Sequence, residues 1–374
     1  MNLKRRLFLS ITASTFLSNF SKNICFTKDS KNNFAQYLSA GADVNGNYFL
    51  SGLTHLGVEQ FRLLIPGRGH GIALRPNSKE VAVFARRPGQ FFVVADILTG
   101  GKIAQINSIK GRHFYGHGIF SPDGLWLYAS ENEYDSGRGV IGVYDVKDSY
   151  SLVETISTHG IGPHEIVLLE GGKTIVVANG GILTHPDSNR LSLNLSEMNS
   201  SLTYIEIDSG KMLSTHKLSP ELQLMSIRHL DVAPDDEIAL VMQYQGPRHH
   251  LHPLVGFQKG SNPINLSSAP DAIGFRMKNY CGSVAFDSSG KLIAVSSPRG
   301  GIITFWSVHE RRFLSSLNVI DASGVSSENN PESFVISNGQ GQIFRHSPLS
   351  QKTEILTSTV NTLWDNHLLL AGNS

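Results

Sequence analysis

The sequence predicts an all-β fold, a β-propeller of seven blades, and three observations support this prediction. A short unit of two apolar strands joined by a polar turn occurs five times, and the units open on His70, His117, His164, His229 and Cys281. Consecutive opening residues are 47, 47, 65 and 52 positions apart, which is the period of propeller blades with loops of variable length. No convincing amphipathic helical pattern interrupts the repeat, so strands make up the domain.

The turns inside the units carry residues that reverse the chain. The first unit runs from His70 through Arg75-Pro76-Asn77-Ser78-Lys79 into the apolar run 81–84. Pro, Asn, Asp and Gly favour the backbone angles of tight turns. The other four turns lie at 121–124, 170–172, 234–236 and 287–290. The further strands that complete the four strands of a blade are expected around 91–96, 140–145, 202–208 and 302–308.

The two ends of the chain complete the count of blades. Residues 34–65 hold two or three expected strands before the first unit, and residues 332–370 hold about four after the last. Five complete units and these flanks make seven blades, with the terminal strands sharing the blade that closes the ring. Six blades is the alternative. A β-sandwich would leave the recurrence of His at one offset unexplained.

Residues 1–28 are interpreted as a twin-arginine-type signal segment, and residues 29–374 as a single propeller domain. Lys4-Arg5-Arg6-Leu7-Phe8-Leu9 places paired arginines at the start of the apolar run 7–17, which is too short to cross a hydrocarbon core of about 30 Å. The pattern is that of a twin-arginine export signal. We therefore expect a periplasmic protein with no transmembrane span in its mature form. An uncleaved N-terminal anchor is the alternative.

Charge and cysteine content restrict the classes of partner and fold stabilisation. The formal net charge is +1 with 17% charged residues, which indicates no polyanion-binding surface, so nucleic acid is not an expected partner. Cys25 lies in the signal segment, so the mature chain has the single thiol of Cys281 and no disulfide. The fold must then be stabilised by core burial.

The repeat also predicts a functional site. The innermost strand of a propeller blade lines the central channel, and the first hairpin returns the chain to the end where that strand began. Residues that open a unit, residues that end its second strand and residues just before it should therefore share one channel rim. These residues are Arg68, His70, Arg86, Arg87, Arg112, His113, His117, Glu131, Asn132, His164, Asn179, Arg228, His229, Gln243 and Arg299, and the loop of the fourth blade adds His185.

Two kinds of chemistry fit this rim. Neutral imidazoles are ligands for zinc, copper or iron. The sequence does not identify a cofactor, and a transition metal ion is the candidate, with His117, His164 and His229 as its ligands. Arginines favour a carboxylate, a phosphate or an acidic protein segment. We therefore expect a non-catalytic binding protein for a metal, a metal chelate or an acidic partner.

Two other classes of function stay open. One is a metal-dependent enzyme, either a lactonase-like hydrolase that uses Glu131 and Asn179 or a copper redox site. The other is a structural scaffold in which the histidines only lock neighbouring blades together. No Gly-x-Ser-x-Gly, phosphate loop, His-Glu-x-x-His or Cys-x-x-Cys pattern occurs, so no residue is assigned a catalytic role.

Several segments resemble a bacterial family of exported proteins known as domain of unknown function 1513. Among them are Gly162-Pro163-His164-Glu165, Ser226-Ile227-Arg228-His229-Leu230 and Ser297-Pro298-Arg299-Gly300-Gly301. The others lie at 112–118, 137–145, 178–187 and 243–246, so the resemblance covers nearly all of the chain after the signal. It implies a propeller of the broader YVTN and quinoprotein-amine-dehydrogenase-like superfamily. Genes of the family often lie near those of imelysin-type, iron-regulated proteins, which implies a role in periplasmic iron handling, with other iron-handling proteins as partners. It implies no established activity or ligand set.

Overall fold

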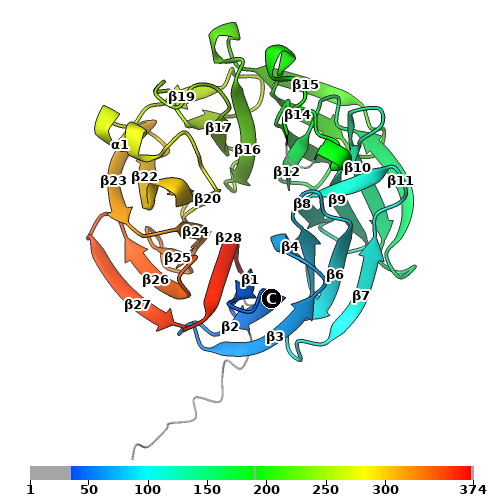
Figure 1. Cartoon of the computed structure of the whole chain (residues 1–374), viewed down its shortest axis with the longest axis horizontal. Coiled ribbons are helices and arrows are strands. Elements are labelled where there is room, and N and C mark those ends of the chain that lie inside the picture. Colours follow the sequence, from blue (N-terminus) through cyan, green and yellow to red (C-terminus); the bar gives the residue numbers. More distant parts are fainter. Residues whose placement is uncertain (1–34, 189–190, 372–374) are drawn as a thin grey trace, which may run out of the picture. The chain divides into compact units, whose positions relative to one another are not determined.

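The structure is a computed structural model that describes residues 35–188 and 191–371. The described residues form seven four-stranded antiparallel sheets, arranged as the blades of a ring around a central channel (Figure 1). The predicted seven-bladed all-β propeller is therefore confirmed. The export signal predicted for residues 1–28 lies outside the described residues.

Six blades are each built from four consecutive strands, and the first strand of each lies against the channel. Blade 2 contains β4 (Gly69–Leu74), β5 (Glu80–Ala85), β6 (Phe91–Asp96) and β7 (Lys102–Asn107). Blade 3 contains β8 (Arg112–Phe120), β9 (Trp126–Glu133), β10 (Arg138–Asp145) and β11 (Ser151–Ser157). Blade 4 contains β12 (Pro163–Leu168), β13 (Thr174–Asn179), β14 (Ser201–Glu206) and β15 (Met212–Lys217).

The next three blades follow the same order. Blade 5 contains β16 (Met225–Val232), β17 (Ile238–Tyr244), β18 (Val255–Gln258) and β19 (Asn265–Ser267). Blade 6 contains β20 (Ser283–Phe286), β21 (Leu292–Ser297), β22 (Ile302–Ser307) and β23 (Arg312–Asn318). Blade 7 contains β24 (Ala322–Ser327), β25 (Phe334–Asn338), β26 (Gln342–Ser347) and β27 (Lys352–Ser358).

Blade 1 joins the two ends of the described chain. Its outer strands are β1 (Tyr37–Asp43), β2 (Tyr48–Leu53) and β3 (Glu59–Ile65), and its innermost strand is β28 (Thr362–Leu370). The antiparallel ladder between β1 and β28 pairs Tyr37 with Leu370 and Asp43 with Thr362. The shared terminal blade that the sequence predicts is therefore present, and its backbone hydrogen bonds close the ring.

The helices of the described residues are short. They are η1 (Pro186–Ser188), η2 (Leu195–Glu197), η3 (Pro220–Leu222), α1 (Asp271–Arg276) and η4 (Pro298–Gly300). In the part of the chain that the structure describes, no helix has the length and apolar character that crossing a membrane requires.

The core lies between neighbouring blades, and the central strands are apolar on both faces for this reason. Successive side chains of a strand point to opposite faces of its sheet. In β5, Val81 and Val83 pack in one cluster with Leu38 of blade 1, whereas Phe84 packs in another with Phe114 of blade 3. Full burial of such a side chain stabilises the fold by about 1.5–3 kcal/mol. Continuous apolar runs such as 81–84 are therefore expected of a blade that is covered on both sides.

The innermost strands share an irregularity that positions the site. The register of the inner hairpin shifts between Gly69 and Ile72 in β4, between Phe114 and Gly118 in β8, and between Pro163 and Ile166 in β12. In β28 the shift falls between Trp364 and Leu368, which pair with Gly41 and Ser39. Bulges of this kind re-aim side chains and bend the strand. A histidine lies inside each of these four bulges.

Candidate functional site

Among the described residues, five histidines from five blades meet on the channel axis. They are His70, His117, His164, His229 and His367, from β4, β8, β12, β16 and β28. The centroids of neighbouring rings lie between 4.5 Å (His70 and His367) and 6.0 Å (His70 and His229) apart. His70, His117 and His229 are buried, and His164 and His367 are partly buried. We call these five side chains the histidine layer.

Two carboxylates fix the orientation of three of the imidazoles. Glu165 lies 3.3 Å from His117 Nδ1 and 3.0 Å from His229 Nδ1, and it also accepts the backbone N–H of Leu230. Asp365 lies 2.9 Å from His70 Nδ1. A carboxylate that accepts the Nδ1–H of a histidine leaves a lone pair on Nε2, the arrangement found behind histidine ligands of metal ions.

Three ring nitrogens of the layer have no hydrogen-bond partner among the described residues. They are His117 Nε2, His164 Nδ1 and His367 Nε2, and all three atoms are buried. A buried polar atom without a partner costs about 1–3 kcal/mol. Coordination to a metal ion is one way in which such an atom gains a partner.

The spacing of the ligand atoms fits this chemistry. Three sets of side chains each place three ligand atoms within 4.8 Å of one another. The sets are His70, His117 and His164; His70, His229 and His367; and His117, Glu165 and His229. Each set offers an ion three donors, and His70, His117 and His229 each belong to two of the sets.

The protonation state of the layer also suits metal binding. Burial lowers the pKa of His70, His164, His229 and His367. These four imidazoles are therefore held in the neutral form, which carries the lone pair that a metal ion needs.

The histidine layer separates two cavities along the channel, each of about 260 Å³. Inner-strand residues that precede a layer histidine, such as Tyr115, Arg228 and Asn366, line one cavity. Residues that follow one, such as Gly118 and Leu230, line the other. Because the inner strands run in the same direction along the channel, the two cavities lie on opposite sides of the layer.

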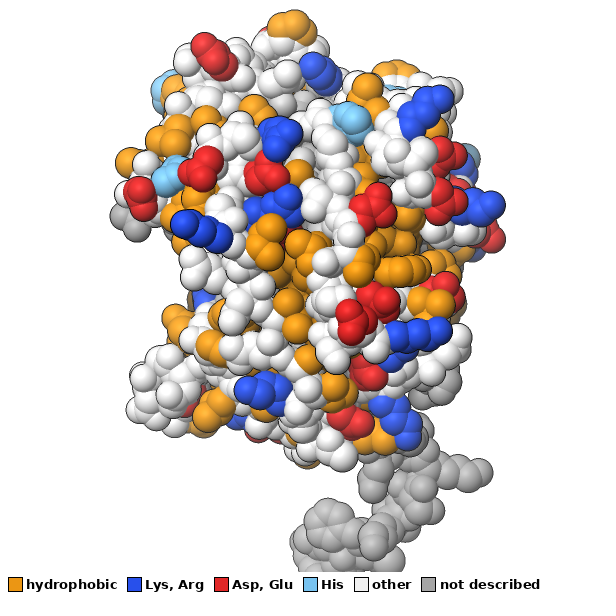
Figure 2. Space-filling view, turned by 90° about the vertical axis from the view of Figure 1, so that its right-hand side faces the viewer, with side chains coloured by type: hydrophobic (Ala, Val, Ile, Leu, Met, Phe, Trp, Pro, Cys, Tyr) orange, Lys and Arg blue, Asp and Glu red, His pale blue; other side chains and the backbone are white. Residues whose placement is uncertain are grey.

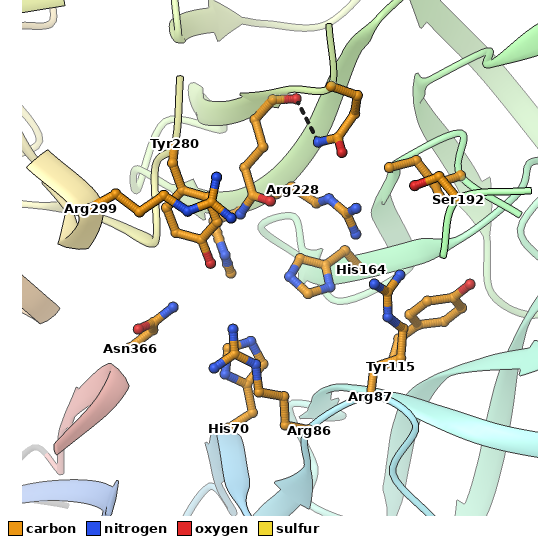
Figure 3. Close-up of a pocket in the computed structure, with 14 residues that line it drawn as sticks. His70, Arg86, Arg87, Tyr115, His164, Ser192, Arg228, Tyr280, Arg299 and Asn366 are labelled. Atoms are coloured by element: carbon orange, nitrogen blue, oxygen red, sulfur yellow. Dashed lines mark hydrogen bonds between the residues drawn. The ribbon is translucent and has the colours of Figure 1, made fainter. Parts of the chain in front are cut away.

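The first of these, which we call the arginine cavity, is strongly basic (Figure 3). Its lining includes Arg86, Arg87, Arg228 and Arg299, and no acidic side chain is among the described residues that line it. The guanidinium of Arg299 lies 4.2 Å from the ring centroid of Tyr280. Burial lowers the pKa of Arg87, whose Nη1 atom is buried and has no hydrogen-bond partner among the described residues.

The opposite cavity has a different character. Its polar lining includes His117, Glu165, Asp231 and His367 of the inner strands, together with serines of β20 and β24. Asp231 accepts the backbone N–H groups of Val232 and Phe286, and burial raises its pKa to about 7. The two mouths of the channel therefore differ in charge, with guanidinium groups on one side of the layer and carboxyl groups on the other.

Nine of the sequence-predicted rim residues meet at the layer or the arginine cavity. They are His70, Arg86, Arg87, His117, His164, Arg228, His229, Gln243 and Arg299. Arg68 lies in a neighbouring cavity of about 300 Å³ and forms an ion pair with Asp365, so it touches the site through that carboxylate.

The other predicted residues are not among those that line the two axial cavities. Glu131 is fully buried inside blade 3, where Tyr144 Oη donates a 2.6 Å hydrogen bond to it and Arg112 lies 3.5 Å away. Asn179 donates to the carbonyl of Thr158 and to side chains within blade 4. Strand alternation turns these side chains into their own blades, although each lies near the end of a second strand.

His113, Asn132 and His185 form a group at the rim between blades 3 and 4. The amide of Asn132 lies 3.1 Å from His113 Nε2 and donates to the carbonyl of Thr184. His185 lies 3.7 Å from Asp135. The structure thus places these residues near the channel mouth but not at the histidine layer.

His367 and Asp365 are site residues that the sequence reasoning missed. They lie on β28, which closes the first blade and is not followed by a hairpin of its own. The sequence pattern of the repeat is a strand, a polar turn and a second strand. Because β28 is not followed by a turn and a second strand, the pattern does not identify it. The expected sharing of a blade by the terminal strands could have located them, because that sharing makes the last strand an innermost one.

Comparisons with known proteins agree with this fold. A family model described as protein of unknown function (DUF1513) matches residues 63–371. The chain is similar to hydrazine synthase of Kuenenia stuttgartiensis, with a TM-score of 0.62 and 15% sequence identity over 90% of this chain and 99% of that chain. At this identity the similarity concerns the fold alone. No curated protein matches the chain.

Proposed function

This chain belongs to the DUF1513 family of proteins of unknown function, and we propose that it is a non-catalytic binding protein of the periplasm whose histidine layer holds a transition metal ion. The observation that carries the proposal is the set of three buried ring nitrogens, on His117, His164 and His367, that have no hydrogen-bond partner among the described residues. The periplasmic location rests on the paired arginines Arg5 and Arg6 of the export segment.

The kind of metal follows from the donor set. Imidazole nitrogen supported by one carboxylate suits Zn²⁺, Cu²⁺, Ni²⁺ or Fe²⁺, whereas Ca²⁺ and Mg²⁺ prefer sites made of oxygen. His70, His117 and His229 each belong to two of the three ligand sets, so two of these residues would contribute to whichever set holds the ion. Glu165 and Asp365 would act from behind the ligands by holding their tautomers.

A purely structural role for the histidines accounts for only part of the geometry. The bond from His70 to Asp365 links blades 2 and 1, and the bond from His229 to Glu165 links blades 5 and 4. Such links account for the hydrogen bonds of the Nδ1 atoms of these two rings. They leave the three unpartnered nitrogens unexplained, since a structural ring would gain stability by pairing or replacing them.

Metal analysis of the purified mature chain tests the proposal. Protein stripped with a chelator is incubated separately with Zn²⁺, Cu²⁺ and Fe²⁺, desalted and measured by elemental mass spectrometry. We expect about one ion per chain for at least one metal. A His117→Ala, His164→Ala double variant should retain at least tenfold less.

The matched control replaces two exposed histidines, His55 and His309, with alanine. It should bind as the wild type does, because neither residue lies in the layer. Circular dichroism establishes that each variant is folded. Failure of the wild type to retain any metal, or equal retention by the folded layer variant, would remove the proposal.

A further inference from the structure

We propose that the arginine cavity binds a small polycarboxylate anion, so that the natural ligand is a metal chelate whose metal lies on the histidine layer and whose carboxylates lie among the arginines. This inference deepens the proposed function and rests on it for the metal. The anion site itself rests on separate observations, which concern the charge, the size and the position of the cavity.

The positive charge of the cavity is concentrated, and no acidic side chain is among the described residues of its lining. Arg86 and Arg87 follow β5 of blade 2, Arg228 lies on β16 of blade 5 and Arg299 lies in η4 of blade 6. Asp365 lies 3.9 Å from Arg86, and it also contacts His70 and Arg68. Four guanidinium groups that converge from three blades repel one another, and a bound polyanion would remove that repulsion.

This concentration differs from the outer surface on the side that Figure 2 shows. Figure 2 shows Lys and Arg side chains interspersed with Asp and Glu side chains over one side of the described propeller. An overall formal charge of +1 therefore conceals a local site of one sign. A single-sign cluster inside a concave site with mixed charge outside is the arrangement that attracts a small anion into the channel.

Several groups of the cavity are suited to hold carboxylates. Guanidinium donors bind a carboxylate through two parallel hydrogen bonds, and Nη1 of Arg87 has no partner among the described residues. Tyr115, Tyr280 and Asn366 add neutral polar groups to the same lining. Figure 3 shows the arginine side chains extending around the space next to His70 and His164.

The size of the cavity limits the ligand. Its volume of about 260 Å³ equals that of roughly nine water molecules at about 30 Å³ each. A molecule of roughly ten non-hydrogen atoms fits this volume. A di- or tricarboxylate has that size, whereas a folded acidic partner does not. Of the anionic ligands that the sequence left open, the structure favours the small chelate.

The position of the cavity couples the two sites. His70, His164 and His229 line the arginine cavity and also belong to the histidine layer. The carboxylate that lies deepest would therefore reach an ion on the layer and complete its coordination. Each ligand should then raise the affinity for the other by the same factor.

Calorimetry with three anions tests this inference. Metal-free wild-type protein is titrated with tricarballylate, citrate and inorganic phosphate, and the tricarballylate titration is repeated after loading with Zn²⁺. We expect both tricarboxylates to bind the metal-free protein, phosphate to bind at least tenfold more weakly, and Zn²⁺ to strengthen tricarballylate binding at least fivefold. An Arg86→Gln, Arg299→Gln double variant should bind tricarballylate at least tenfold more weakly than the wild type.

The control is Arg312→Gln on the outer strand β23. This side chain is 59% exposed and paired with Glu310. It should bind tricarballylate as the wild type does. Failure of the metal-free wild type to bind either tricarboxylate, or unchanged binding by the double variant, overturns the inference. Phosphate binding as tight as tricarboxylate binding overturns the polycarboxylate class.

The two proposals can fail separately. A wild type that binds metal but no tricarboxylate retains the proposed function and loses this inference. A wild type that binds tricarboxylates through its arginines but holds no metal loses the proposed function and the coupling, and keeps only the anion site.

Discussion

Protonation of His113 should destabilise the propeller as the pH falls, and its hydrogen bonds explain why. His113 is 1% exposed, and its Nδ1 atom lies 3.0 Å from the carbonyl of Phe114, so Nδ1 carries the proton and donates. Nε2 then accepts from the amide of Asn132, at 3.1 Å. That amide also donates to the carbonyl of Thr184, which fixes its orientation. A second proton on Nε2 would place two donors against each other.

The magnitude follows from the pKa. Burial lowers the pKa of His113 from 6.5 to about 4, against a smaller opposing effect of its bond to Phe114. Between these two values the unfolded chain binds a proton that the folded chain does not, so stability is complete above pH 6.5 and is lost as the pH falls toward 4. At about 1.4 kcal/mol per pKa unit, the loss is about 3 kcal/mol.

Urea denaturation between pH 7.5 and 4 measures this loss. His113→Gln cannot take up the proton. The difference in the free energy of unfolding between the variant and the wild type should therefore shift by about 3 kcal/mol in favour of the variant as the pH falls from 7.5 to 4. His309→Gln, at an exposed turn, controls for removal of an imidazole. If the wild-type and His113→Gln stabilities run parallel across the range, the assignment of a buried neutral imidazole is wrong.

Two further predictions concern buried groups of blades 3 and 6. In Gly142→Ala the new Cβ would lie 2.0 Å from Oε1 of the buried Glu131, so overpacking should cost about 1–3 kcal/mol. The denaturation midpoint should fall relative to Gly101→Ala, whose Cβ meets only Thr99 Oγ1 at 3.1 Å, and equal midpoints would contradict the packing. Burial raises the pKa of Cys281 to about 12, so in a Cys25→Ser chain a thiol reagent at pH 8 should label Cys281 only after unfolding in urea. Rapid labelling of the folded chain would show that the thiol is reachable.

The fold was predictable because its signals are local and repeated. Turn residues and apolar runs recur at the blade period, and each is readable within about 15 residues. The count of seven needed one further step, the pairing of β1 with β28, which no local pattern encodes. That pairing followed from the requirement that a propeller close its ring.

The candidate site was predictable only in part, because the facing of a side chain depends on register. A shift of one residue moves a side chain from one face of a sheet to the other. Gln243 and Glu131 both lie near the end of a second strand, yet Gln243 lines the arginine cavity and Glu131 packs against Tyr144 inside its blade. The bulges that bring His117 and His367 to the axis were equally invisible in the spacing of the repeat.

The same bonds that close the ring prepare the histidine layer. Asp365 and His367 lie on β28, so the strand that completes blade 1 also brings a carboxylate to His70 and a fifth imidazole to the axis. Glu165 does the same between blades 3, 4 and 5, since it is hydrogen-bonded to His229 and lies 3.3 Å from His117 Nδ1. The contacts that link neighbouring blades therefore use Nδ1 atoms of these rings. Other ring nitrogens of the layer have no hydrogen-bond partner among the described residues. In the proposed function, the contacts that link the blades and the bound metal ion would use opposite sides of the same rings.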